Sequence, residues 1–139
     1  MPQNGPTFCK IKFAIQVNSS PYHSQAGYSA YQFICAALAE GHEVLRVFFY
    51  HEGIYHAFKY ATPPDDEPHF SALWRDLAQR HQLDLAVCIS AAQRRGLLCA
   101  DEAARQGKPG LDVCAGFRIA GLSQLFEAID AADRFIVFG

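Results

Sequence analysis

Cys88 is the residue of this chain whose setting best favours chemistry. It ends the short apolar run 83–88 and is followed by the segment 90–96, which contains Ser90, Gln93 and two arginines, so a thiol at a strand-to-helix junction is predicted. At the carboxyl ends of strands in an open α/β sheet, side chains are held rigidly and can meet solvent or a partner. A helix N-terminus, with Arg94 and Arg95 close behind, would favour the thiolate, which is the reactive form. The pattern predicts one working cysteine.

Two alternatives for Cys88 remain open on the residues alone. Free cysteines are commonly inert core residues, and a strand end is a suitable place for one. A cysteine hydrolase would need a base, and His23, in the segment after the first predicted strand, is the best placed histidine. Tyr22 and His23 are predicted to line the same end of the sheet. Adjacent residues on a helix lie about 100° apart, so at most one of Arg94 and Arg95 is expected to face Cys88.

The other four cysteines are expected to have no role. Cys35 falls within a helical apolar pattern, Cys9 lies near the N-terminus, and Cys99 and Cys114 lie in polar segments where they could react incidentally. An odd number of cysteines, with no C-x-x-C pair and no secretion signal, argues against a disulfide framework.

Apolar patterns with alternating periods predict the elements that position Cys88. Strands are expected at 11–17, 43–49, 83–88, 117–119 and 134–138, and helices at 24–40, 70–81, 91–105 with a break near Gly96, and 122–132. Gly41 is a natural helix stop, and the proline-acidic segment 62–68 is expected to be an exposed loop. Strands that alternate with helices predict an α/β fold: a three-layer α/β/α sandwich with a mostly parallel five-stranded sheet. Residues 1–10 are expected to be a flexible leader and residues 11–139 a single domain.

Composition limits the classes of partner. The net charge of −2 disfavours direct nucleic-acid binding, which normally needs a basic stripe or patch. The first ten residues resemble neither a signal peptide nor a membrane anchor, so a cytoplasmic protein without membrane contact is expected. Half of the residues are hydrophobic, including 11 Phe, and part of this apolar excess is expected in subunit contacts.

Motifs for a metal or a nucleotide are incomplete. His51 and His56 are five residues apart, which would rotate them by about 140° on a helix, so they do not form the zinc-protease pair. The segment 107–110 lacks the upstream glycine and the Ser or Thr of a phosphate loop and is expected to be a turn. The sequence predicts neither a metal nor an organic cofactor.

Segment 87–96, which contains Cys88, resembles the active-cysteine segment of the DsrE/TusD family of sulfur-relay proteins. Further similarities follow in the same order along the chain, at 12–17, 41–43, 46–53, 62–64 and 117–122. The likeness covers about 12–138. It implies the DsrE-like α/β/α sandwich, and it implies that Cys88 receives sulfane sulfur as a persulfide and passes it to a partner protein, a sulfurtransferase activity.

The resemblance also implies partners. The family subunit works in a heterohexamer with related DsrF-like and DsrH-like, or TusC-like and TusB-like, subunits. It takes sulfur from a TusA-like or rhodanese-like donor and delivers it to a DsrC-like or TusE-like acceptor. Gln93 and the 63–66 loop are closer to the sulfur-oxidation branch, DsrE, than to TusD, which serves 2-thiouridine formation in tRNA. A TusD-like subunit and a noncatalytic scaffold subunit are the alternatives.

Overall fold

The computed structural model describes residues 8–110 and 112–139, in which there are five strands and five α-helices, with at least one helix after each of the first four strands. The predicted leader lies largely outside the described residues. The strands are β1 (Lys12–Val17), β2 (Glu43–Phe49), β3 (Leu85–Cys88), β4 (Phe117–Ala120) and β5 (Arg134–Phe138). The helices are α1 (Ala26–Ala39), α2 (Phe70–His81), α3 (Ile89–Arg94), α4 (Ala100–Arg105) and α5 (Leu122–Ala131), with a 3₁₀ helix η1 (His51–Ala57) after β2.

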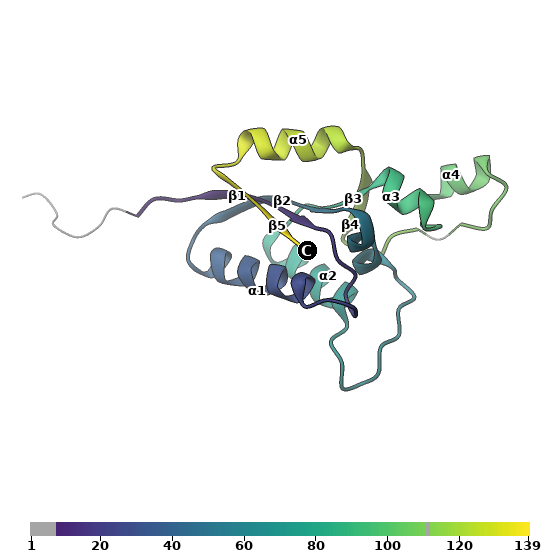
Figure 1. Cartoon of the computed structure of the whole chain (residues 1–139), viewed down its shortest axis with the longest axis horizontal. Helices are drawn as coiled ribbons and strands as arrows, with labels where there is room; N and C mark the ends of the chain where they lie inside the picture. The colour runs from purple at the N-terminus through teal and green to yellow at the C-terminus, as the bar shows by residue number, and fades with distance from the viewer. Residues whose placement is uncertain (1–7, 111) are drawn as a thin grey trace, which may run out of the picture.

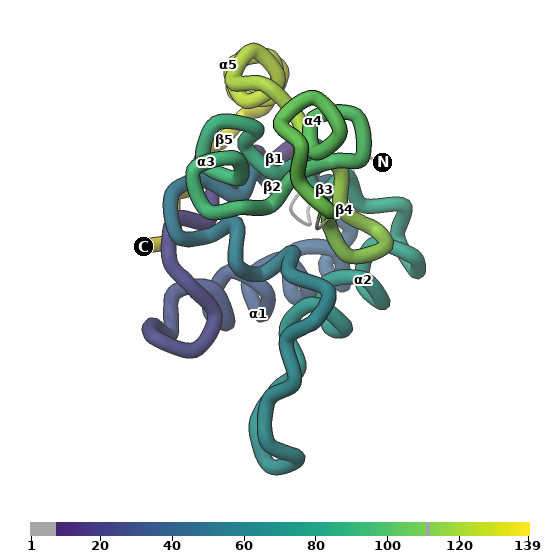
Figure 2. The backbone as a smooth tube through the Cα atoms, turned by 90° about the vertical axis from the view of Figure 1, so that its right-hand side faces the viewer, coloured from purple at the N-terminus to yellow at the C-terminus, as the bar shows by residue number. Residues whose placement is uncertain are grey.

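The sheet has the strand order β4-β3-β2-β1-β5, and every pair is parallel. Helices α1 and α2 cover one face and α5 covers the other (Figure 1). This arrangement confirms the predicted three-layer sandwich. Because all strands run the same way, the segments that follow β1, β2 and β3 emerge at the same end of the sheet, where the carboxyl ends of the strands lie. This end faces the viewer in Figure 2.

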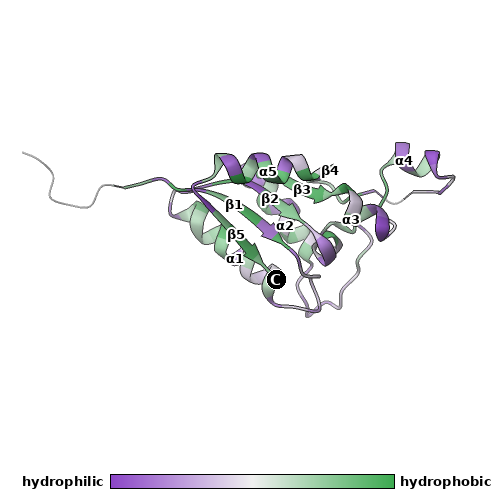
Figure 3. Cartoon of the chain, turned by 45° about the horizontal axis from the view of Figure 1, so that its top comes forward, coloured by the Kyte–Doolittle hydropathy of each residue, from purple (hydrophilic) through white to green (hydrophobic). Residues whose placement is uncertain are grey.

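The apolar strands in the middle of the sheet explain why Cys88 is held rigidly. All four residues of β3 are buried, since β3 lies between β2 and β4 and has layers of helix on both sides. Figure 3 shows the strands as largely hydrophobic, whereas α4, which projects beyond α3, is largely hydrophilic. The short β3 thus ends at a fixed point from which α3 begins.

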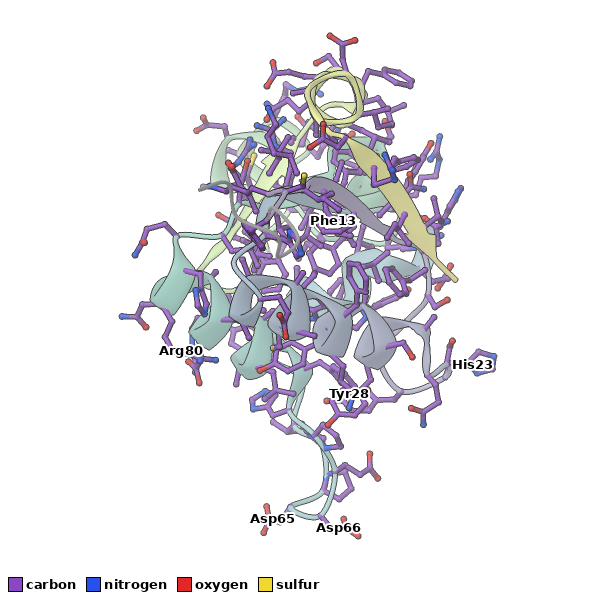
Figure 4. The ribbon with its side chains drawn as sticks, turned by 90° about the vertical axis from the view of Figure 1, so that its left-hand side faces the viewer. Phe13, His23, Tyr28, Asp65, Asp66 and Arg80 are labelled. Carbon is purple, nitrogen blue, oxygen red and sulfur yellow. The ribbon has the colours of Figure 1, made fainter. Side chains whose placement is uncertain are left out.

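The turn between α1 and β2 and the loop before α2 both match the sequence. Gly41 has φ +88°, a left-handed conformation that glycine adopts without a Cβ penalty, and the amide of His42 donates to the carbonyl of Ala37 at 2.9 Å. Gly41 is therefore the helix stop that was predicted. The 62–68 loop is exposed along most of its length, and Asp65 and Asp66 lie at its tip (Figure 4).

An ionic cluster fastens α5 to the sheet on the face opposite α1. Asp84 accepts hydrogen bonds from the guanidinium groups of Arg46, at 2.6 Å, and Arg118, at 2.7 and 2.9 Å. Arg46 also donates to the backbone carbonyl of Gln124 in α5 at 2.7 Å. Burial raises the pKa of Asp84, but the hydrogen bonds from both arginines outweigh it and hold this pKa below its ordinary value.

We expect Asp84→Asn to lower the free energy of unfolding by about 1–3 kcal/mol, because it leaves two partly buried guanidinium groups without their shared carboxylate. Urea denaturation at neutral pH measures this loss. The matched control is Asp76→Asn, which breaks the exposed Arg75–Asp76 pair and should cost less than about 0.5 kcal/mol. Equal losses in the two variants would contradict a stabilising role for the Asp84 cluster.

Candidate functional site

Cys88 is the last residue of β3 and the N-cap of α3, so the strand-to-helix junction is present as predicted. Its backbone is extended, with φ −61° and ψ 122°, and it pairs with Ala120 of β4. Side chains alternate along a strand, so Cys88 faces the same side of the sheet as Asp84, which is the side covered by α5. The helix that follows has six residues.

The thiol of Cys88 is buried in this chain, whereas an accessible thiol was expected. The residue is 1% exposed and belongs to the core cluster, together with Ala91 and Ala92 on the inner face of α3. The reason is geometric: a small apolar side chain at the strand end packs with the small residues of the next helical turn. Ile89 and Ser90, by contrast, are exposed. Reaction at Cys88 therefore requires its surroundings to open.

Arg95 is held at the C-terminal end of α3 by contacts on two sides. Its guanidinium donates to the carboxylate of Glu52 in η1, at 2.7 and 3.3 Å, and to the backbone carbonyl of Ala91 at 3.0 Å. The charge of Arg95 is thus paired, and it lies against the helix that begins at Cys88. Arg94 is exposed, and no hydrogen bond or ion pair engages its guanidinium within residues 8–110 and 112–139. The two arginines point in different directions, as helical geometry requires.

Tyr22 and His23 follow β1 and so lie at the carboxyl end of the sheet, as Cys88 does, but they are not close to Cys88. Strand β1 is two positions from β3 in the sheet, a separation of roughly 10 Å. The Tyr22 hydroxyl donates to the carbonyl of Pro68 at 2.8 Å and accepts from the amide of Phe70 at 3.5 Å. His23 is exposed and points away from the body of the molecule (Figure 4). The Tyr22 hydroxyl therefore bonds to the start of α2 and to Pro68 just ahead of it, not to Cys88.

Tyr22 and His23 instead line an aromatic pocket of about 540 Å³ beside η1. Its other walls come from the segments after β1 and β2: Ser20, Pro21, Tyr55, Phe58, Tyr60 and Ala61. Burial raises the pKa of the Tyr22 phenol above its ordinary value, so this hydroxyl stays protonated at neutral pH. Cys88 is not among the residues that line this pocket.

His56 is a buried residue beside the site whose role the sequence did not reveal. It is 0% exposed; its Nδ1 accepts the indole N–H of Trp74 at 3.1 Å, and its Nε2 lies 3.2 Å from the carbonyl of Ser19. These partners fix the neutral tautomer with the proton on Nε2. Burial lowers its pKa to about 4. His56 therefore ties η1, which also carries Glu52, to α2 and to the segment after β1.

The remaining cysteines separate by burial. Cys9 is exposed, Cys35 and Cys99 are intermediate, and Cys114 is buried. Cys114 was expected in a polar segment, but its side chain joins the core. In the described part of the chain, no group of three or more metal-ligating side chains is close enough to hold an ion. None of the helices described is long and apolar enough to span a membrane.

Comparison with known proteins places these features in a family. The DsrE/DsrF-like family matches residues 11–138, which is nearly the whole chain. A protein named putative sulfurtransferase DsrE, from Allochromatium vinosum, is 50% identical over 129 residues, covering 93% of this chain and 99% of that protein. A protein named sulfurtransferase TusD homolog, from Pseudomonas aeruginosa, is 46% identical over 129 residues, covering 93% of this chain and 98% of that protein. Both likenesses include the segment around Cys88.

A solved structure shares the fold at low sequence similarity. The crystal structure of the ychN protein from E. coli superimposes with a TM-score of 0.74 at 16% identity, covering 92% of this chain and 99% of that one. The sandwich is therefore the same in both proteins. The match in sequence, from 11 to 138, and the match in fold agree with the resemblance found in the sequence. This chain belongs to the DsrE/DsrF-like family.

Proposed function

We propose that the protein is a sulfurtransferase subunit of a sulfur relay, and that Cys88 carries the sulfur as a persulfide. The observation that carries the proposal is the thiol of Cys88 at the junction of β3 and α3, in a chain 50% identical to a protein named putative sulfurtransferase DsrE. A carrier needs one cysteine that is held on a rigid element and that a donor and an acceptor can reach. The buried end of β3 holds Cys88 rigidly, and the helix that follows it, α3, has only six residues.

The transfer balances without a cofactor. The Cys88 thiolate attacks the outer sulfur of a donor persulfide, the donor S–S bond breaks, and the donor thiolate leaves with the electron pair. Cys88 then holds the extra sulfur as a persulfide anion. An acceptor thiolate attacks that outer sulfur, the new S–S bond breaks, and Cys88 leaves as a thiolate. Sulfur moves from one cysteine to another, and nothing is oxidised or reduced overall.

Dissimilatory sulfur oxidation is the pathway branch we propose, with a TusD-like role in tRNA thiolation as the alternative. The 50% identity to the protein named DsrE against 46% to the TusD homolog supports this order. We propose a heterohexamer with DsrF-like and DsrH-like subunits, a TusA-like or rhodanese-like donor and a DsrC-like acceptor. The exposed apolar side chains Phe126, Phe135 and Val137 offer area for subunit contacts. The five unpaired cysteines are consistent with a cytoplasmic protein.

We expect Cys88→Ser to abolish loading by a persulfide donor, because serine cannot form the S–S bond. Intact-protein mass spectrometry should show the wild type gaining the mass of one sulfur atom, which a reductant then removes. The control is Cys99→Ser, which removes a partly exposed thiol and should load as the wild type does. Equal loading of the wild type and Cys88→Ser would contradict a carrier at Cys88 and favour a scaffold role.

A further inference from the structure

Cys88 is enclosed, so some part of its surroundings must open before it can react. Cys88 is 1% exposed, and α3 begins directly after it. Ala91 and Ala92 of α3 are also buried. Among the described residues, helix α3 makes its main contacts with two short elements, β3 and η1. A helix of six residues has little internal stability, so its tertiary contacts decide how often it opens.

We propose that Glu52 and Arg95 form a latch that holds α3 closed over Cys88 and so sets how often the thiol is exposed. This inference rests on the proposed function, since it concerns the residue that would carry sulfur. The two residues are positioning residues: they act through α3 and do not touch the reacting sulfur.

The geometry of the ion pair suits a latch. Two nitrogens of Arg95 donate to one carboxylate oxygen of Glu52, at 2.7 and 3.3 Å, and a third donates to the carbonyl of Ala91 at 3.0 Å. The Arg95 side chain is 21% exposed and that of Glu52 is 54% exposed, so water can compete for the pair. A contact of this kind is strong enough to bias a local opening and weak enough to be broken by a partner.

Both ends of the latch are placed by local backbone features. Glu52 follows His51, whose φ of +50° is uncommon for a residue with a side chain and turns the chain from β2 into η1. Arg95 precedes Gly96, whose φ of +85° ends α3, and the buried Leu97 then anchors the chain. The segment between Cys88 and Leu97 is thus fixed at its two ends, and Arg95 joins it to η1 through Glu52.

The test is the alkylation rate of Cys88 by iodoacetamide, measured peptide by peptide with mass spectrometry in the folded protein. When α3 opens and closes faster than the reagent reacts, the rate follows the open fraction. We expect Glu52→Gln and Arg95→Gln each to raise the Cys88 rate about threefold to fivefold, the range set by an ion pair of this exposure. The double variant should react no faster than Arg95→Gln alone, because both changes remove the same contact.

The two variants change the local charge in opposite directions, and this distinguishes a latch from a direct electrostatic effect on the Cys88 thiol. Loss of Glu52 raises the local positive potential and would favour the thiolate, whereas loss of Arg95 lowers it and would disfavour the thiolate. A latch predicts faster reaction in both variants. Faster reaction in Glu52→Gln with slower reaction in Arg95→Gln, or no change in either, would overturn the proposal.

Two internal controls keep the result specific. Cys114 is buried in the same protein, and its alkylation reports opening elsewhere, so its rate should not change; an equal rise at Cys114 would mean general loosening and would contradict the latch. Glu102→Gln breaks the Glu102–Arg105 pair of α4, in which only Arg105 is largely exposed, and should leave the Cys88 rate unaltered. Alkylation requires no sulfur donor, so a protein that fails to load sulfur would still reveal whether the latch exists.

Discussion

Gly53→Ala should destabilise the protein by about 3 kcal/mol or more, the upper end of the range for overpacking a closed site. Gly53 is buried in η1, and a Cβ built at this position would overlap the backbone carbonyl oxygen of Val17 at the end of β1. That carbonyl accepts the amide of Tyr50 at 2.9 Å, so moving it also breaks a bond between β1 and the end of β2. The atoms that would have to move belong to the backbone of β1, which cannot shift as easily as the end of a flexible side chain.

Thermal or urea unfolding of the Gly53→Ala protein measures the effect, and Gly121→Ala is the matched control. Gly121 has an ordinary negative φ, and the nearest atom to an added Cβ is the hydroxyl of Ser123 at 3.9 Å. We expect this control to lose less than about 1 kcal/mol, mostly from helix capping. Equal losses of stability in the two variants would contradict the close approach of η1 to the end of β1.

Acid should destabilise the protein through His56 in a defined window. The pKa of this buried imidazole is about 4 in the folded protein, below its ordinary value of 6.5, because burial penalises the charged form. The unfolded chain therefore binds the proton more readily. The stabilisation is fully present above pH 6.5, falls as the pH drops from 6.5 towards 4, and amounts to about 3 kcal/mol over that interval.

The measurement is the free energy of unfolding at a series of pH values for the wild type and for His56→Gln. The glutamine amide can accept from the Trp74 indole and donate to the Ser19 carbonyl, as the imidazole does, but it does not titrate. All other titrating groups are common to both proteins, so the difference between their pH curves isolates His56. Parallel curves between pH 4 and 6.5 would contradict the buried, neutral imidazole.

The fold was largely predictable because its signals are local. Glu43–Phe49 and Phe70–His81 begin and end where the apolar periods change, and Gly41 ends α1 as expected. The break in the 91–105 helix was also visible, since Gly96 has the positive φ that glycine allows. The 3₁₀ geometry of η1 was not predicted, because it depends on the close contact of Gly53 with β1, far away in sequence.

The candidate site was predictable in its position but not in its environment. The run before Cys88 and the polar segment after it indicate a strand end, and the structure has one there. The burial of that thiol depends on how the elements around the end of β3 pack, and Arg95 pairs with Glu52, 43 positions away in sequence; no local pattern encodes either feature. His56 was missed for the same reason: its partners Trp74 and Ser19 come from two other elements.

The most direct test of the central claim is to locate the sulfur in the wild-type protein. The protein is treated with one equivalent of a persulfide donor, its thiols and persulfides are capped with an alkylating reagent, and the digest is mapped by mass spectrometry. We expect the extra sulfur on the peptide that contains Cys88, and we expect it to disappear when a thiol acceptor is added before capping. Sulfur spread over Cys9, Cys35 and Cys99, with none on Cys88, would contradict the account.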